Sequence, residues 1–179
     1  HRLTFEPSVD WLSGEVVNVS LVSAEDILGN PLQDAPISWH YTIDMTGPYF
    51  WDPLPADGET LATIPDFITI RICDSLSPLS TTDFSMYING VTYEASSPHL
   101  SLVIDTTTDG HCGMMIFDRM GYPIYPDPSG AVHIAVVASD MPTLCDGNIQ
   151  DFGWTFYVAS DTGGVVTRVD SCPPVMSYW

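Results

Sequence analysis

Apolar and polar residues alternate along most of the chain. Every second residue is apolar in the segments 17–21, 68–72, 84–88 and 154–158. This period of two is typical of antiparallel strands with one buried face, and no segment has a convincing helical period. The pattern predicts an all-β protein. Its strands are expected near residues 17–21, 39–43, 49–50, 67–73, 84–88, 91–94, 100–104, 114–118, 131–138, 152–159 and 165–169.

The dipeptide Asn89-Gly90 lies between two of these segments. Both residue types accept the positive φ angles of a two-residue hairpin turn. The surrounding residues 84–94 are therefore expected to form a β-hairpin. Fifteen prolines and thirteen glycines separate the other segments at strand-length intervals.

Residues 13–47 resemble residues 129–163, about one β-sandwich length further along. Both segments contain an alternating Val-rich stretch, an Asp followed by Gly-Asn, and an aromatic Trp-x-Phe/Tyr stretch. The matched residues are Val17, Val19 and Leu21 with Val132, Ile134 and Val136; Asp26 with Asp140; Gly29-Asn30 with Gly147-Asn148; and Trp39, Tyr41 and Ile43 with Trp154, Phe156 and Val158. The chain is therefore predicted to hold about one and a half units.

The phase of this repeat sets the expected domain boundaries. Residues 1–45 are expected to be the last three or so strands of one sandwich, and residues 46–160 a complete sandwich. Residues 161–179 are expected to contain the first strand of a further unit.

Several motifs resemble bacterial immunoglobulin-like (Ig-like) domains. They are the Phe-Ile-Thr-Ile strand at 67–70, Asp74 before Leu-Ser-Pro-Leu-Ser, the segment from Phe84 to Tyr93, the Ser13-Gly14 turn and the Trp-x-Phe/Tyr ending. The resemblance implies tandem Ig-like β-sandwiches, which occur in secreted and surface-anchored prokaryotic proteins. Such units serve adhesion, spacing and polymerisation, so the resemblance indicates fold more specifically than function.

The chain is strongly acidic, with 23 acidic residues, four Arg and no Lys, for a formal net charge of −19. Nucleic-acid phosphates and anionic membranes would repel such a surface. No stretch reaches the roughly 18 apolar residues that a membrane helix needs. Neither a nucleic-acid partner nor a membrane span is expected.

The four cysteines are widely spaced, which fits disulfides in an oxidising compartment. Free buried thiols are the alternative. The topology implied by the Ig-like resemblance places the loops that hold Cys73 and Cys145 at one end of the sandwich, which predicts a bond between them. Cys112 and Cys172 then remain as a second pair, unless Cys172 bonds a neighbouring subunit.

Catalysis has little support. The five histidines are scattered, and neither a G-x-S-x-G motif nor a Gly-rich phosphate loop is present. We expect no enzyme activity and no organic cofactor. His133 alternates with apolar neighbours and is expected to face solvent.

Two matching acidic loops are candidate Ca²⁺ sites, because short Asp/Asn/Gly loops offer oxygen ligands. The candidate ligands are Glu25, Asp26, Asp140 and Asp146. The same residue types also form tight turns, which is the favoured interpretation.

Asn18 begins an Asn-Val-Ser sequon and is a candidate glycosylation site if the host glycosylates. The alternation places it on the face opposite Val17 and Val19, toward solvent.

The incomplete first unit favours a secreted, non-enzymatic structural protein of an extracellular filament or surface appendage. Its uncovered strands are expected to pair with a neighbouring copy, because free strand edges are templates for pairing. The expected assembly residues are Trp39, Tyr41, Ile43, Val165 and Val169.

A carbohydrate- or cell-binding adhesin is the alternative, with Trp11, Trp51, Trp179 and the Tyr122–Tyr125 turn as aromatic candidates. A third interpretation is a piece of a longer stalk.

Overall fold

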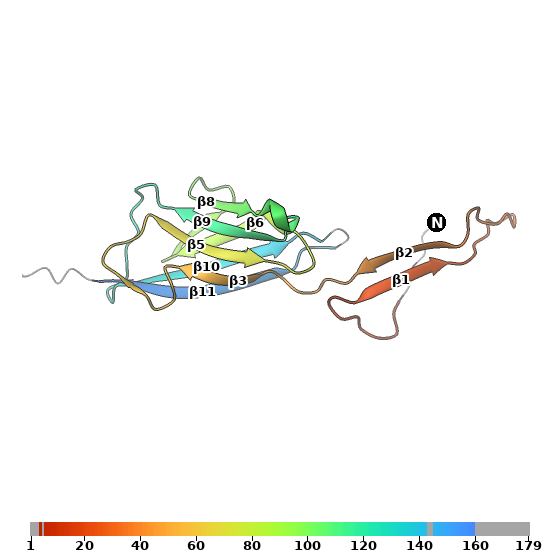
Figure 1. Ribbon diagram of the computed structural model, residues 1–179, viewed down its shortest axis with the longest axis horizontal. Coiled ribbons are helices and arrows are strands. Elements are labelled where there is room, and N and C mark those ends of the chain that lie inside the picture. The colour runs from red at the N-terminus through yellow and green to blue at the C-terminus, as the bar shows by residue number, and fades with distance from the viewer. Residues whose placement is uncertain (1–3, 5, 143–144, 160–179) are drawn as a thin grey trace, which may run out of the picture.

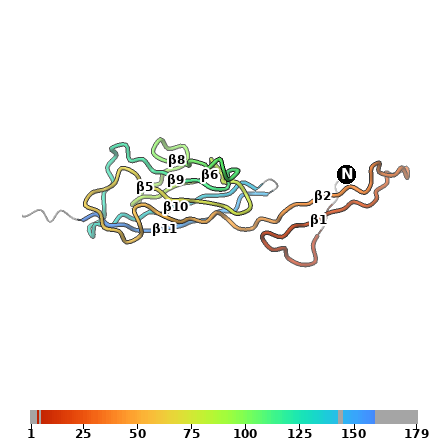
Figure 2. The backbone as a smooth tube through the Cα atoms, in the orientation of Figure 1, coloured from red at the N-terminus to blue at the C-terminus, as the bar shows by residue number. Residues whose placement is uncertain are grey.

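The computed structural model of the protein describes residues 4, 6–142 and 145–159. It contains a two-stranded hairpin followed by a β-sandwich of nine strands (Figures 1 and 2). Strands account for 49% of the residues and helix for 2%, which confirms the prediction of an all-β fold. The described residues include no helix long and apolar enough to cross a membrane.

The hairpin consists of β1 (Val16–Leu21) and β2 (Ile37–Thr42). The sandwich strands are β3 (Tyr49–Leu54), β4 (Thr60–Leu61), β5 (Phe67–Cys73), β6 (Leu79–Ile88), β7 (Val91–Glu94), β8 (Leu100–Ile104), β9 (Cys112–Asp118), β10 (Ala131–Asp140) and β11 (Ile149–Val158). A 3₁₀ turn, η1 (Thr106–Thr108), precedes β9.

The sandwich has two layers. One sheet has the strand order β4-β11-β10-β6-β7 and the other β3-β5-β9-β8. All strand pairs are antiparallel except β4 with β11. The hairpin lies beyond one end of the sandwich, and β11 ends at the other (Figure 1).

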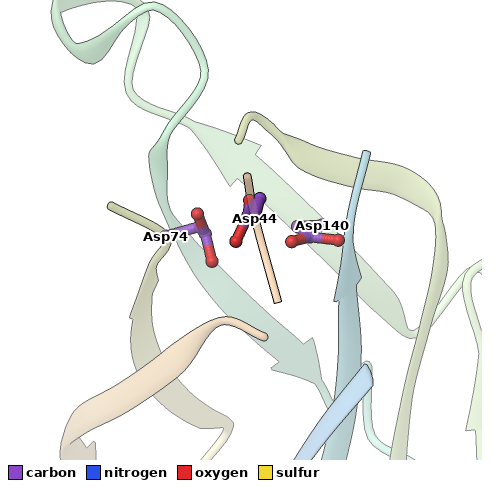
Figure 3. A group of neighbouring side chains, drawn as sticks. All are labelled: Asp44, Asp74 and Asp140. Atoms are coloured by element: carbon purple, nitrogen blue, oxygen red, sulfur yellow. The ribbon is translucent and has the colours of Figure 1, made fainter. Parts of the chain in front are cut away.

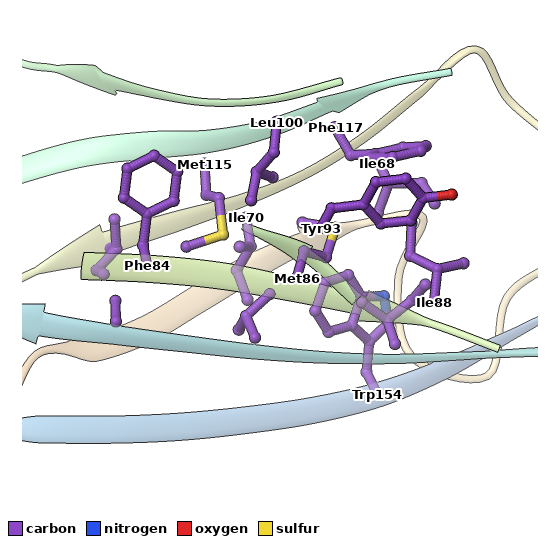
Figure 4. Close-up of a cluster of buried hydrophobic side chains, with 14 of the residues drawn as sticks. Ile68, Ile70, Phe84, Met86, Ile88, Tyr93, Leu100, Met115, Phe117 and Trp154 are labelled. Carbon is purple, nitrogen blue, oxygen red and sulfur yellow. The ribbon is translucent and has the colours of Figure 1, made fainter. Parts of the chain in front are cut away.

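The core lies between the two sheets and consists of the residues that the alternation places on their inner faces (Figure 4). The alternate residues of β5, β6 and β11 are almost completely shielded from solvent, with at most 6% exposure: Ile68, Ile70, Ile72, Phe84, Met86, Ile88, Trp154 and Phe156. Trp154 also donates its indole N–H to the Pro55 carbonyl at 3.0 Å, so its polar atom is satisfied inside the core.

The turn between β6 and β7 confirms the expected hairpin. Asn89 and Gly90 have φ angles of 42° and 92°, and Ile88 pairs with Val91 across them. Two adjacent residues with positive φ match the right-handed twist of the flanking strands.

The structure differs from the expected strands at several places, including the following three. β6 begins at Leu79 rather than residue 84, because its pairing with β10 continues past a bulge between Ala138 and Asp140. β4 was not expected, and its two residues are too few to show a periodic pattern. The described part of residues 1–45 contains two strands rather than about three.

Candidate assembly interface

The β1–β2 hairpin has the same register as the β10–β11 hairpin. Val17 pairs with Tyr41 and Val19 with Trp39 in the first hairpin. Their sequence equivalents pair identically in the second, Val132 with Phe156 and Ile134 with Trp154. The internal repeat is therefore a structural repeat, and β1–β2 is the counterpart of β10–β11, the last two strands of the sandwich.

The turns of the two hairpins are closed by the same contacts. The Asn30 side chain donates to Asp26 Oδ2 at 2.8 Å, and the Asp26 N–H donates to the Asn30 carbonyl at 2.9 Å. Asn148 and Asp140 make the equivalent contacts at 2.9 and 3.2 Å. The matched Asp and Asn residues thus hold the turns, as the favoured interpretation of these loops predicted.

The two hairpins differ in what surrounds them. In the sandwich, β6 flanks β10, β4 flanks β11, and the second sheet covers their inner faces. Within the described residues, β1 and β2 form a sheet of their own with no third strand. Both outer edges of this hairpin therefore have backbone groups without a strand partner, which is the condition under which strands from other chains pair.

One face of the β1–β2 hairpin is apolar. Directly paired residues lie on the same side of a sheet, so this hairpin face comprises Val17, Val19, Leu21, Ile37, Trp39 and Tyr41. Trp39 is 49% exposed and Ile37 41% exposed, whereas Trp154, the equivalent of Trp39, is 4% exposed. Among the described residues, an aromatic side chain covers only the Tyr41 end, where the Trp11 ring lies 6.0 Å from the Tyr41 ring between centroids.

The predicted assembly residues are only partly brought together. Trp39 and Tyr41 lie on the hairpin face, and Ile43 follows the end of β2 and is half-buried. Val165 and Val169 lie outside the described residues.

Three carboxylates meet where the hairpin joins the sandwich (Figure 3). Asp44 follows β2, Asp74 follows β5 and Asp140 ends β10, and one oxygen from each lies within 4.8 Å of the others. Asp74 and Asp140 are buried, and Ser77 donates its hydroxyl to Asp44. Of these three, Asp140 was a candidate ligand from the sequence and the other two were not, because no local pattern connects residues on three separate elements.

The candidate Ca²⁺ ligands lie in two separate turns, as the two matching loops implied. Glu25 and Asp26 lie in the β1–β2 turn, whereas Asp140 ends β10 and Asp146 lies in the turn that follows it. In each turn an Asn side chain donates a hydrogen bond to the Asp carboxylate, and Ca²⁺ binding at these turns stays a prediction. Within the described residues, the one group of three acidic side chains close enough to share an ion is Asp44, Asp74 and Asp140.

The same Asp–Asn contact has opposite effects on the two carboxyl groups. At Asp26, which is exposed, the Asn30 hydrogen bonds hold the pKa below its usual value of 3.8. At Asp140, burial raises the pKa despite the Asn148 bonds, and the negative charges of Asp44 and Asp74 add to the rise. The folded protein therefore binds a proton at Asp140 more tightly than the unfolded chain does.

This proton makes stability depend on pH. The stabilisation that protonated Asp140 gives the folded state is complete below the unfolded pKa of 3.8. It is lost as pH rises through the higher pKa of the folded state. We expect the contribution of Asp140 to the free energy of unfolding to increase as pH is lowered from 7 toward the unfolded pKa of 3.8, measured by urea unfolding in EDTA. Asp74→Asn should reduce this increase, because it removes a negative charge beside Asp140 while keeping the oxygen that accepts from Leu76 and Ser77.

Glu94→Gln is the control, since it removes one charge from β7, outside this group. If it reduces the pH response as much as Asp74→Asn, the response comes from the overall net charge and not from the three carboxylates.

The disulfide prediction was wrong in its pairing. Cys73 is bonded to Cys112, not to Cys145, so the predicted Cys112–Cys172 bond is wrong as well. Cys73 ends β5 and Cys112 begins β9, and the two are directly paired across adjacent strands with Cα atoms 4.1 Å apart. Cys145 is exposed and has no disulfide partner among the described residues, and Cys172 lies outside them.

The other candidate residues lie on the surface. Asn18 and His133 are exposed, as predicted, and glycosylation at Asn18 stays a prediction. Trp51 stacks on Tyr49 at 5.4 Å on the outer side of β3, and Tyr125 is 75% exposed in the loop before β10. Trp179 lies outside the described residues.

Comparison with known proteins does not identify a family for this chain. No protein-family model and no curated protein matches the chain.

Proposed function

We propose that this chain is a non-enzymatic structural subunit of an extracellular filament or surface appendage, assembled head to tail from Ig-like sandwiches. The observation that carries the proposal is the β1–β2 hairpin, which repeats β10–β11 in register but lacks the flanking strands and the second sheet. A hairpin of this kind is part of a sandwich whose other strands come from elsewhere.

The strand order supports the Ig-like character of the unit. Ig-like sandwiches pair their first, second, fifth and fourth strands in one sheet and their third, sixth and seventh in the other. The sheet β3-β5-β9-β8 and the strands β6, β10 and β11 of the second sheet fit this arrangement. The Cys73–Cys112 bond supports an oxidising, and hence extracellular, location.

Burial energies favour a partner for the hairpin face. An exposed large apolar side chain forgoes about 1.5–3 kcal/mol relative to burial. On the hairpin face Ile37 and Trp39 are exposed, and the other four residues are only partly buried, so covering this face favours association. The two free edges provide the backbone groups that fix the geometry of the contact.

We propose that a neighbouring copy covers the hairpin face, and that the segment 162–179 of this copy makes the contact. By the repeat, this segment corresponds to the region of β3, the first strand of the complete unit. In the sandwich, Phe50 of β3 stacks on Phe152 of β11 at 6.1 Å. The equivalent of Phe152 in the first hairpin is Ile37, so the apolar residues near Val165 to Val169 of a neighbour are proposed to pack over β2.

Sedimentation velocity over a range of concentrations tests this proposal. The full chain should form a concentration-dependent series of oligomers, and a chain truncated after residue 161 should remain monomeric. A full chain that stays monomeric at every concentration would contradict the proposal.

The adhesin alternative depends on one observation. Tyr49 and Trp51 form a stacked aromatic pair on the outer side of β3, with exposures of 56% and 37%, and such a pair can stack on a sugar ring. Glycan-array binding that is lost in Trp51→Ala, by a protein that stays monomeric, would favour this alternative over the structural proposal.

A further inference from the structure

The internal joint between the hairpin and the sandwich shows how one unit follows another. The β10–β11 turn, with Pro142 and Cys145, faces Tyr41 to Asp44 at the end of β2 across a cavity of about 480 Å³ that Leu76 and Pro78 also line. The turn between the last two strands of one unit thus lies against the end of the last strand of the unit before it.

The equivalent turn of the first hairpin has nothing to face within the described chain. Ile27 and Leu28 lie in this turn and are 93% and 81% exposed. The Asp26–Asn30 contacts hold the backbone around them, with Leu28 donating its N–H to Asp26 Oδ1 at 2.8 Å. Two apolar side chains are therefore presented to solvent on a turn that is fixed in shape.

The opposite end of the molecule offers the matching surface. The residues equivalent to Tyr41 to Asp44 are at the end of β11, where Tyr157 is 40% exposed. Tyr125 lies at this same end, held there through Asn89. The Asn89 side chain donates to the Tyr125 carbonyl at 2.8 Å, and the Asn89 backbone N–H donates to the carbonyl of His133 in β10. Figure 1 shows the β1–β2 turn and the end of β11 at opposite ends of the long axis.

We propose that Ile27 and Leu28 of one copy dock on the β11 end of a second copy, beside Tyr125 and Tyr157, so that the contact between chains repeats the internal joint. This inference rests on the proposed function, since it names the surface by which head-to-tail assembly proceeds. Each copy has one turn and one β11 end, so the contact is heterologous and propagates along a filament. Because the chains carry a net charge of −19 each, added salt should favour the contact by screening their repulsion.

The test compares the assembly of full-length variants by sedimentation at matched concentration and salt. Ile27→Ser with Leu28→Ser should raise the concentration needed for assembly roughly tenfold or more, or about 1.4 kcal/mol per contact. Tyr125→Ala should have a similar effect, and combining it with the turn variant should add little, because both remove one contact. Val103→Ser with Val137→Ser, two exposed residues on β8 and β10, serves as the control and should assemble normally.

The outcomes separate the inference from the proposed function. If the wild type assembles and both the turn and Tyr125 variants assemble equally well, the docking inference is wrong while filament assembly stands. If the wild type does not assemble at all, the proposed function fails, and the docking inference with it.

Discussion

Trp154→Ala should lower the free energy of unfolding of the sandwich by about 3–5 kcal/mol, the usual cost of removing a large buried aromatic side chain. Trp154 is 4% exposed and its indole N–H is bonded to the Pro55 carbonyl, so the substitution leaves both a cavity and an unpaired acceptor. Its repeat equivalent, Trp39, is 49% exposed, and Trp39→Ala should change sandwich stability by less than about 0.5 kcal/mol in dispersed protein.

The two variants should show the reverse order in assembly. Trp39→Ala removes the largest side chain from the hairpin face, so oligomers should be lost although the sandwich remains folded. Urea unfolding at low protein concentration gives the stability, and sedimentation gives the assembly state. If Trp39→Ala retains wild-type assembly, the hairpin face is not the surface that a neighbour covers.

Replacing Cys73 and Cys112 by alanine should lower the free energy of unfolding by about 2–5 kcal/mol. The bond closes a loop with a sequence separation of 39, for which the restriction of the unfolded chain corresponds to about 4 kcal/mol. Urea unfolding of the double variant and of the wild-type protein measures this loss of free energy of unfolding.

Cys145→Ala is the matched control for the disulfide. Cys145 is exposed, so its removal should leave sandwich stability unchanged. Peptide mapping without reduction should recover Cys73 linked to Cys112. Recovery of Cys73 linked to Cys145 would contradict the structure.

Local sequence signals predicted most of the strands. The alternation in residues 68–72 and 154–158 specifies which face is buried, and Asn89-Gly90 specifies a turn geometry that few other dipeptides accept. The repeat predicted the equivalence of the two hairpins, because the Val-rich and the aromatic stretch are the same number of residues apart in both segments, which fits an equal register.

Features that depend on contacts between distant strands were not predictable in the same way. The disulfide pairing required knowing that β5 and β9 are neighbours in one sheet with Cys73 opposite Cys112, which no local pattern encodes. The grouping of Asp44, Asp74 and Asp140 likewise arises from three separate elements. The matched Asp26 and Asp140 loops were identified from sequence, but their different burial, and so the opposite directions of their pKa values, depends on the fold around them.

Amide hydrogen exchange of the full chain, above and below its assembly concentration, tests most directly whether another copy covers the hairpin. We expect β1 and β2 to exchange rapidly in dilute protein and to become protected on assembly, approaching the protection of β10 and β11, whose exchange stays slow in both states. Rapid exchange of β1 and β2 at every concentration, with β10 and β11 protected throughout, would contradict assembly through this hairpin.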